Sequence, residues 1–98
     1  SLPAAVTMGD LLRRARRTFR DYVRGVDFSG PFIMIKTYPG GAHAVAAIID
    51  ELDWPEMVGS IAGDDSILVL SRDPERKENR PQGPAGKLYA RIQELVEG

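Results

Sequence analysis

Two short segments of the chain are apolar at every position, and this feature limits the fold more than any other. Phe32–Ile35 and Ile67–Leu70 have the length of strands and are too short for buried helices. A strand covered by helices on one face alone should alternate apolar and polar residues, because successive side chains point to opposite faces. We therefore expect both faces of the sheet that contains these strands to be covered.

Hydrophobic spacing and turn residues divide the rest of the chain into short elements. Helices are expected over residues 9–20, 42–52 and 87–96, and strands over residues 22–28, 32–37, 57–62 and 66–71. The order predicts an α+β two-layer sandwich: a four-stranded antiparallel sheet with two packing helices (ββαββα), preceded by an N-terminal linker helix. Residues 1–8 are interpreted as a flexible lead, residues 9–98 as a single domain, and residues 72–86, with three prolines, as an exposed loop.

A chain of 98 residues has too few helices to cover both faces of such a sheet. The simplest explanation is that a second copy of the chain covers the face that the helices leave open, so the apolar strands predict a homo-oligomer. The alternative is that the N-terminal helix packs on that face.

Composition excludes several classes of site. The chain has no cysteine, which rules out disulfides and thiolate metal sites. A single histidine, His43, rules out chemistry that needs two imidazoles. Because no apolar run approaches 18 residues, we expect no segment that spans a membrane. We also expect no membrane partner, and a cytoplasmic setting by default.

The net charge of −1 hides a strong segregation. Residues 9–24 hold six arginines against two aspartates, a net charge of +4. Residues 27–70 hold one lysine against seven acidic residues, a net charge of −6. The basic segment is interpreted first as a solvated helix face, with contact to nucleic acid or another acidic surface as the alternative.

The acidic centre contains the residues best suited to bind a ligand. Asp64 and Asp65 lie in a tight turn, where two neighbouring carboxylates repel each other unless a cation offsets them. The alternative is that they only shape the turn, since aspartate is a common turn residue. His43 and Asp50 lie two helical turns apart with alanines between them, which leaves room for a ligand or a neighbouring chain; the alternative is a plain solvent face.

The glycines before this helix add an anion-binding element. Gly40-Gly41 would leave backbone N–H groups open at a helix start, where the dipole favours an anion. Together, the anion-binding helix start and the carboxylates suit an amino acid with a cationic side chain. A guanidinium fits best, because its fork of donors pairs well with carboxylates.

The same residues form a pattern that resembles a known family. Lys36–His43, then Ile48–Asp50, then Val58–Val69 with its Gly-Ser-Ile-Ala-Gly-Asp-Asp-Ser-Ile run, are similar to the C-terminal domain of bacterial arginine repressors. The resemblance covers roughly residues 8–96 and implies a regulator rather than an enzyme. It implies that L-arginine binds as corepressor between subunits of trimers that pair into hexamers, with no metal or other cofactor. Operator DNA would be read by an N-terminal winged helix-turn-helix domain, which this chain does not match.

The resemblance also implies roles for individual residues. Asp64 and Asp65 would meet the guanidinium, His43 and Asp50 would lie near the α-amino end of the ligand, and Ala62 would offer a backbone contact. Two alternatives stay open from the residues alone. One is an oligomerisation module without a ligand, and the other is a small enzyme or metal site that uses His43, Asp50 and Asp64, with Asp65 as a further metal ligand.

Overall fold

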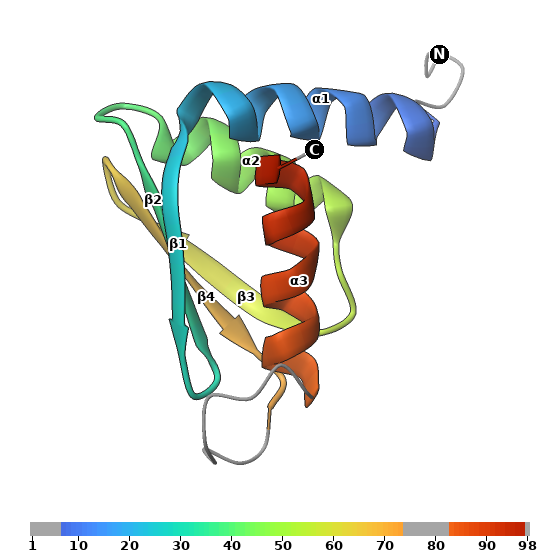
Figure 1. Cartoon of the computed structure of the whole chain (residues 1–98), viewed down its shortest axis with the longest axis vertical. Helices are drawn as coiled ribbons and strands as arrows, with labels where there is room; N and C mark the ends of the chain where they lie inside the picture. Colours follow the sequence, from blue (N-terminus) through green and yellow to red (C-terminus); the bar gives the residue numbers. More distant parts are fainter. Residues whose placement is uncertain (1–6, 74–82, 98) are drawn as a thin grey trace.

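The computed structural model describes residues 7–73 and 83–97, and it places a layer of helices on one face of a sheet (Figure 1). The sheet order is β1-β2-β4-β3, and all neighbouring strands are antiparallel. The elements in chain order are α1 (Met8–Tyr22), β1 (Val23–Ser29), β2 (Phe32–Thr37), α2 (Ala42–Leu52), β3 (Met57–Ala62), β4 (Ser66–Ser71) and α3 (Gly83–Glu97). The predicted α+β sandwich, a helix followed by ββαββα, is confirmed.

The core lies between the sheet and the helices. The inward positions of the two central strands are almost completely buried, because they alternate with positions on the opposite face. The helices close this core with side chains at helical spacing. Its largest fully buried apolar members are Phe19, Ile33, Ile35, Val45, Ile49, Ile67, Val69, Leu88 and Ile92.

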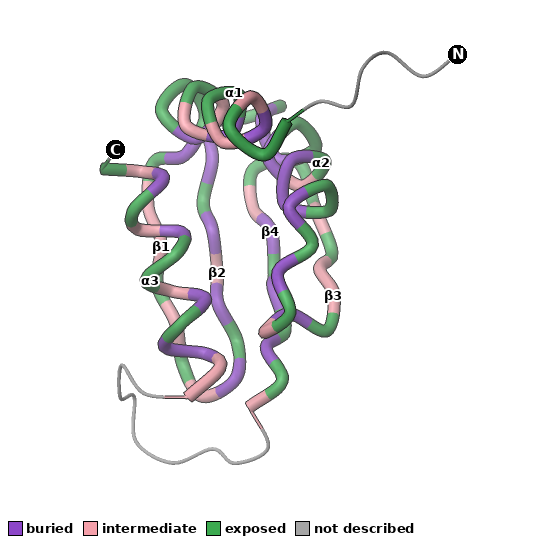
Figure 2. Tube along the Cα trace, turned by 90° about the vertical axis from the view of Figure 1, so that its right-hand side faces the viewer, coloured by how far each residue is buried: buried purple, intermediate pink, exposed green. Residues whose placement is uncertain are grey.

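Helix α1 does not cover the outer face of the sheet. It crosses one end of the molecule and packs on α2 and α3, on the same side of the sheet as those two helices (Figures 1 and 2). The alternative in which the N-terminal helix covers that face is therefore wrong. Large apolar side chains remain exposed on this outer face from three strands: Phe32, Val58, Ile61, Leu68 and Leu70.

Two boundaries near α1 differ from the prediction. The helix begins at Met8, within the segment interpreted as a flexible lead, because the Thr7 hydroxyl accepts a hydrogen bond from the Asp10 N–H and caps it. At the other end, Tyr22 belongs to α1 and not to the first strand. Tyr22 matched the strand pattern because it lies an even number of residues before Val26 and Phe28, although it is not part of the strand. Residues 1–6 of the expected lead lie outside the described residues.

The last helix begins earlier than expected. Residues 83–86 belong to α3 and not to a loop, because Pro84 lies in the first turn, where proline is favoured. Gly83 before it has a φ of 81°, which glycine tolerates. The Asp73 carboxylate accepts a hydrogen bond from the Ala85 N–H at 3.4 Å and so caps the helix start. The part of the expected loop from 74 to 82 lies outside the described residues.

Asp53 ends α2 in a left-handed conformation that favours glycine. Its φ is 48° and its ψ is 52°, and its side chain makes no hydrogen bond or ion pair with another described residue. We expect Asp53→Gly to raise the free energy of unfolding by about 1 kcal/mol, since it relieves the strained dihedral angle and removes a negative charge from a helix C-terminus. Asp53→Asn, which removes only the charge, should give less than half of this gain in urea denaturation. An Asp53→Gly chain no more stable than the parent would contradict this explanation.

Glu56 joins the segment before β3 to α3. Its carboxylate accepts two hydrogen bonds from Arg91, from Nε at 2.9 Å and from Nη2 at 3.1 Å. These bonds hold the pKa of Glu56 below its ordinary value of 4.5. The pair therefore contributes stability above about pH 4.5 and loses it as the pH falls through the lowered pKa. We expect Glu56→Gln to cost about 0.5–1 kcal/mol at pH 7 and progressively less as the pH falls below 4.5, in denaturation measured at a series of pH values.

Candidate functional site

The turn before α2 is shaped by contact with the end of α1. Gly40 has a φ of 81°, a conformation that other residues rarely adopt. A Cβ at Gly41 would lie 2.8 Å from the Tyr22 ring, so only glycine fits under this side chain. The Tyr38 N–H donates a hydrogen bond to the Tyr22 carbonyl at 2.9 Å, which also holds the turn against the end of α1. The two glycines are thus needed for packing and backbone conformation.

The Gly-Asp-Asp turn between β3 and β4 is bonded to this same segment. The Asp64 carbonyl accepts hydrogen bonds from the N–H groups of Gly40, at 3.1 Å, and Ala42, at 3.3 Å. The Asp65 carbonyl accepts from the Thr37 N–H at 2.8 Å. Residues about 25 positions apart in the chain therefore form one rigid unit of two joined turns.

These bonds correct one sequence-based expectation. The backbone N–H groups at Gly40 and Gly41 are not open to an anion, because Gly40 donates to Asp64 and Gly41 donates to the Tyr38 carbonyl at 3.0 Å. The N-cap residue Gly41 also has no side chain to bond the first turn of α2. The glycines place the start of α2 against the acidic turn, which the sequence pattern alone did not reveal.

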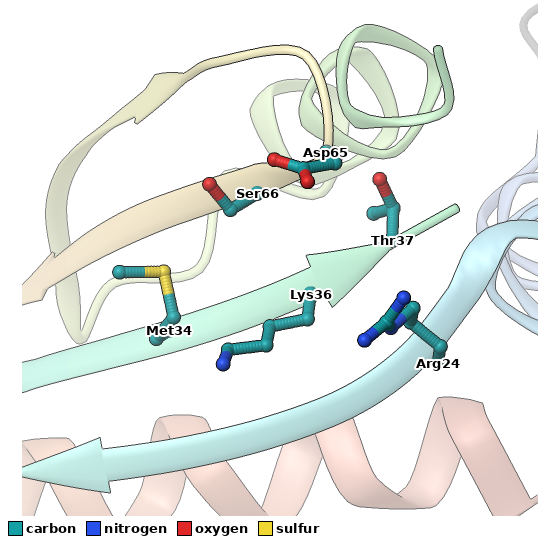
Figure 3. A pocket seen from close by; sticks show the side chains of 6 residues that line it. All are labelled: Arg24, Met34, Lys36, Thr37, Asp65 and Ser66. Atoms are coloured by element: carbon teal, nitrogen blue, oxygen red, sulfur yellow. The ribbon is translucent and has the colours of Figure 1, made fainter. Parts of the chain in front are cut away.

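The two carboxylates of the turn have different surroundings. Asp64 is exposed, and its Oδ2 accepts only a long hydrogen bond, 3.3 Å, from the Gly40 N–H. Asp65 lies at the edge of a hollow of about 290 Å³ on the outer face of the sheet (Figure 3). Neither carboxylate forms an ion pair with a described residue. Both are therefore available to a cation from outside the described chain.

The hollow beside Asp65 contains two cationic side chains that sequence reasoning assigned to no site. Arg24 from β1 and Lys36 from β2 line it, together with Met34, Thr37 and Ser66 (Figure 3). A signal for Lys36 was present, since it is the only cation between residues 27 and 70 and shares the outer face with Phe32 and Met34. Gly25 of β1 pairs with Lys36 of β2, and this pairing places the neighbouring residue Arg24 beside the hollow.

His43 and Asp50 lie on the exposed side of α2, as expected. Both are exposed, and neither side chain makes a hydrogen bond or ion pair with another described residue. His43 follows Ala42, whose N–H donates a hydrogen bond to the Asp64 carbonyl. His43 and Asp64 therefore belong to the same pair of joined turns. Asp50 lies two turns further along the helix. Ala62 is half-buried at the end of β3, opposite Ile67, one residue before the turn.

Residues 7–73 and 83–97 contain neither a metal cluster nor a membrane-spanning helix. No three histidine, aspartate or glutamate side chains in these ranges gather closely enough to hold a metal ion. Asp50, Asp64 and Asp65 thus do not form the cluster that a metal site would require. In the same ranges, no helix has the length and apolar character needed to cross a bilayer.

Comparison with known proteins identifies the family. The family model described as "Arginine repressor, C-terminal domain" matches residues 19–81, which include both joined turns, α2 and the four strands. The chain belongs to the arginine repressor family.

Individual arginine repressors match most of the chain. The one from Moorella thermoacetica is 44% identical over 85 residues, which cover 87% of this chain and 51% of the relative. The one from Carboxydothermus hydrogenoformans is 43% identical over 96 residues, 98% of this chain and 59% of the relative. The one from Thermotoga petrophila is 46% identical over 69 residues, 70% and 45% of the two chains.

The chain thus spans about half the length of the arginine repressors that it matches. These relatives are named as repressors, which are transcriptional regulators and not enzymes. The family supports a role for this chain as a regulator domain, in agreement with the resemblance drawn from residues 36–69.

Proposed function

We propose that this chain is the effector-binding and oligomerisation domain of an arginine-responsive transcriptional regulator, with L-arginine as its corepressor. The observation that carries the proposal is the acidic turn: two exposed carboxylates that have no cationic partner among the described residues and are held by backbone bonds against the start of α2. A guanidinium suits this arrangement, because it presents several donors in a fixed plane to carboxylate oxygens.

Each candidate residue takes one part of the ligand in this proposal. Asp64 and Asp65 receive the guanidinium, and their different surroundings suit contacts from two directions. His43 and Asp50, exposed on α2, lie near the α-amino end. Ala62 offers its backbone next to the turn. No metal or other cofactor takes part.

The uncovered outer face of the sheet supports assembly with further copies of the chain. Its apolar side chains line two adjoining hollows of about 230 and 340 Å³, which meet at Phe32 and Leu68. A second copy would remove this apolar surface from water. We propose trimers that pair into hexamers, with L-arginine held between subunits, where it stabilises only the assembled form.

The wider role follows from the family. The intact protein would control genes of arginine biosynthesis or catabolism in the cytoplasm. It would read operator DNA through a winged helix-turn-helix domain outside these 98 residues. The second candidate is an oligomerisation module without a ligand, which the apolar sheet face supports by itself.

Calorimetry separates these candidates. We expect the chain to bind L-arginine much more tightly than L-lysine, whose point charge lacks the planar fork, and not to bind L-citrulline, which lacks the charge. Light scattering should give a trimer or hexamer, with L-arginine shifting the mass upward. If the chain assembles but none of these amino acids gives a heat of binding, the oligomerisation module without a ligand would be favoured. Heat from Mg²⁺ alone would favour a metal site.

A further inference from the structure

The arginines of α1 fall into three groups with different surroundings. Leu11, Ala15 and Phe19 form the buried side of the helix. On one flank, Arg14 donates to Glu51 of α2 at 2.9 Å, and on the other Arg16 pairs with Glu94 of α3 at 3.5 Å. The flanking arginines thus join α1 to the two helices beneath it.

The remaining arginines point away from the molecule. Arg13, Arg17 and Arg20 follow each other at i, i+4 and i+7, on the side of α1 opposite the buried residues. Arg13 pairs within the helix with Asp10. The side chains of Arg17 and Arg20 make no hydrogen bond or ion pair with another described residue. We call Arg13, Arg17 and Arg20 the outward row.

Helix stability does not explain this row. Arg20 lies in the last turn, where a cation is favoured by the helix dipole. Arg17 lies in the middle of the helix, where the dipole gives no such gain. The charges of Arg17 and Arg20 are thus not neutralised by an ion pair with any described residue.

We propose that the outward row of α1 contacts the phosphate backbone of duplex DNA, independently of sequence and of the arginine site. The row extends roughly 10 Å along the helix axis, at 1.5 Å per residue, which matches about three phosphate intervals of one strand at 3.4 Å each along the duplex axis. Guanidinium groups pair with phosphate oxygens in the same planar geometry that they use with carboxylates. A regulator that acts on DNA has such a polyanion close to it.

A protein partner fits the outward row less well. Between the exposed Met8 and Tyr22 at its two ends, the exposed residues of α1 are glycine, arginine and aspartate. Protein interfaces have an apolar core, and this surface offers none. Its position across one end of the molecule also separates the row from the outer sheet face that we assign to further copies (Figures 1 and 2).

The test uses the whole 98-residue chain and a short fluorescent duplex of arbitrary sequence, between about 50 and 200 mM salt. We expect weak binding, with dissociation constants on the order of 10⁻⁶–10⁻⁴ M and a strong salt dependence. An operator and a scrambled duplex should differ by less than about tenfold, because specific recognition needs contacts to base edges. The double variant Arg17→Gln with Arg20→Gln should reduce the salt slope by about 2, or 0.9 for each lost phosphate contact.

The matched control combines Arg14→Gln with Arg91→Gln. It removes the same charge from two half-exposed arginines that are already paired with glutamates. The control should keep the parent's salt slope, and thermal unfolding should show that both double variants are folded. Equal losses in the two variants would mean that only net charge matters and would overturn the proposal. So would a parent chain that does not bind DNA, or an outward-row variant that changes the assembled mass and not DNA binding.

Discussion

Asp64→Asn should lower the affinity of the chain for L-arginine by about 2–5 kcal/mol, as is typical when one member of a desolvated charge pair is removed. Asparagine keeps the size and the turn preference of aspartate but not the charge, so a purely structural Asp64 would tolerate the change. Calorimetric titration with L-arginine measures the loss. Asp65→Asn should act in the same direction. Asp53→Asn, an exposed aspartate at the end of α2, is the matched control and should leave binding unchanged.

The structure adds a second expectation for the ligand-free chain. The turn is held by the Asp64 carbonyl, which the substitution leaves in place, while the carboxylate adds only the long bond from the Gly40 N–H. Relief of the repulsion between the neighbouring carboxylates should therefore leave the Asp64→Asn chain at least as stable as the parent in urea. Unchanged L-arginine binding in both single variants would show that the Gly-Asp-Asp turn is structural and that the ligand binds elsewhere.

Local patterns predicted the fold well because each element has its own periodicity. The continuous apolar runs of β2 and β4, and the spacing of Val45, Ile48, Ile49 and Leu52 in α2, are local signals, and the structure confirms the elements that they predict. The errors occurred at element ends. Tyr22 and Gly83–Gly86 were assigned wrongly, because a cap or a helix end depends on a few bonds, such as Asp73 to Ala85, that periodicity does not contain.

The candidate site was predictable in its residue types but not in its construction. Asp64, Asp65, His43 and Asp50 stood out as polar residues in an apolar part of the chain. The backbone bonds that join the Asp64 carbonyl to Gly40 and Ala42 connect distant segments, and no local pattern encodes them. The two carboxylates have different surroundings, since Asp65 lies beside the hollow that Arg24 and Lys36 line. This difference likewise depends on how β1 and β2 are paired.

The outer sheet face has its centre at Leu68. This residue pairs with Met34 on β2 and with Ile61 on β3, and it lines both apolar hollows. Its side chain is 37% exposed in the single chain, so a glutamate there can reach water while the chain is alone. Between two copies, the same charge would be buried without a partner.

Leu68→Glu should therefore convert the assembly to monomers while the chain stays folded. Burial of an unpaired carboxylate costs several kcal/mol in each copy, which is enough to shift the assembly equilibrium by at least about a thousandfold. Light scattering measures the mass, and circular dichroism checks the fold. Ala90→Glu is the matched control, because Ala90 is exposed on α3, on the helical side of the sheet, and it should keep the parent's mass. A folded Leu68→Glu chain with the parent's mass would mean that the outer face is not the interface, and the apolar residues of β2 and β4 would then need another explanation.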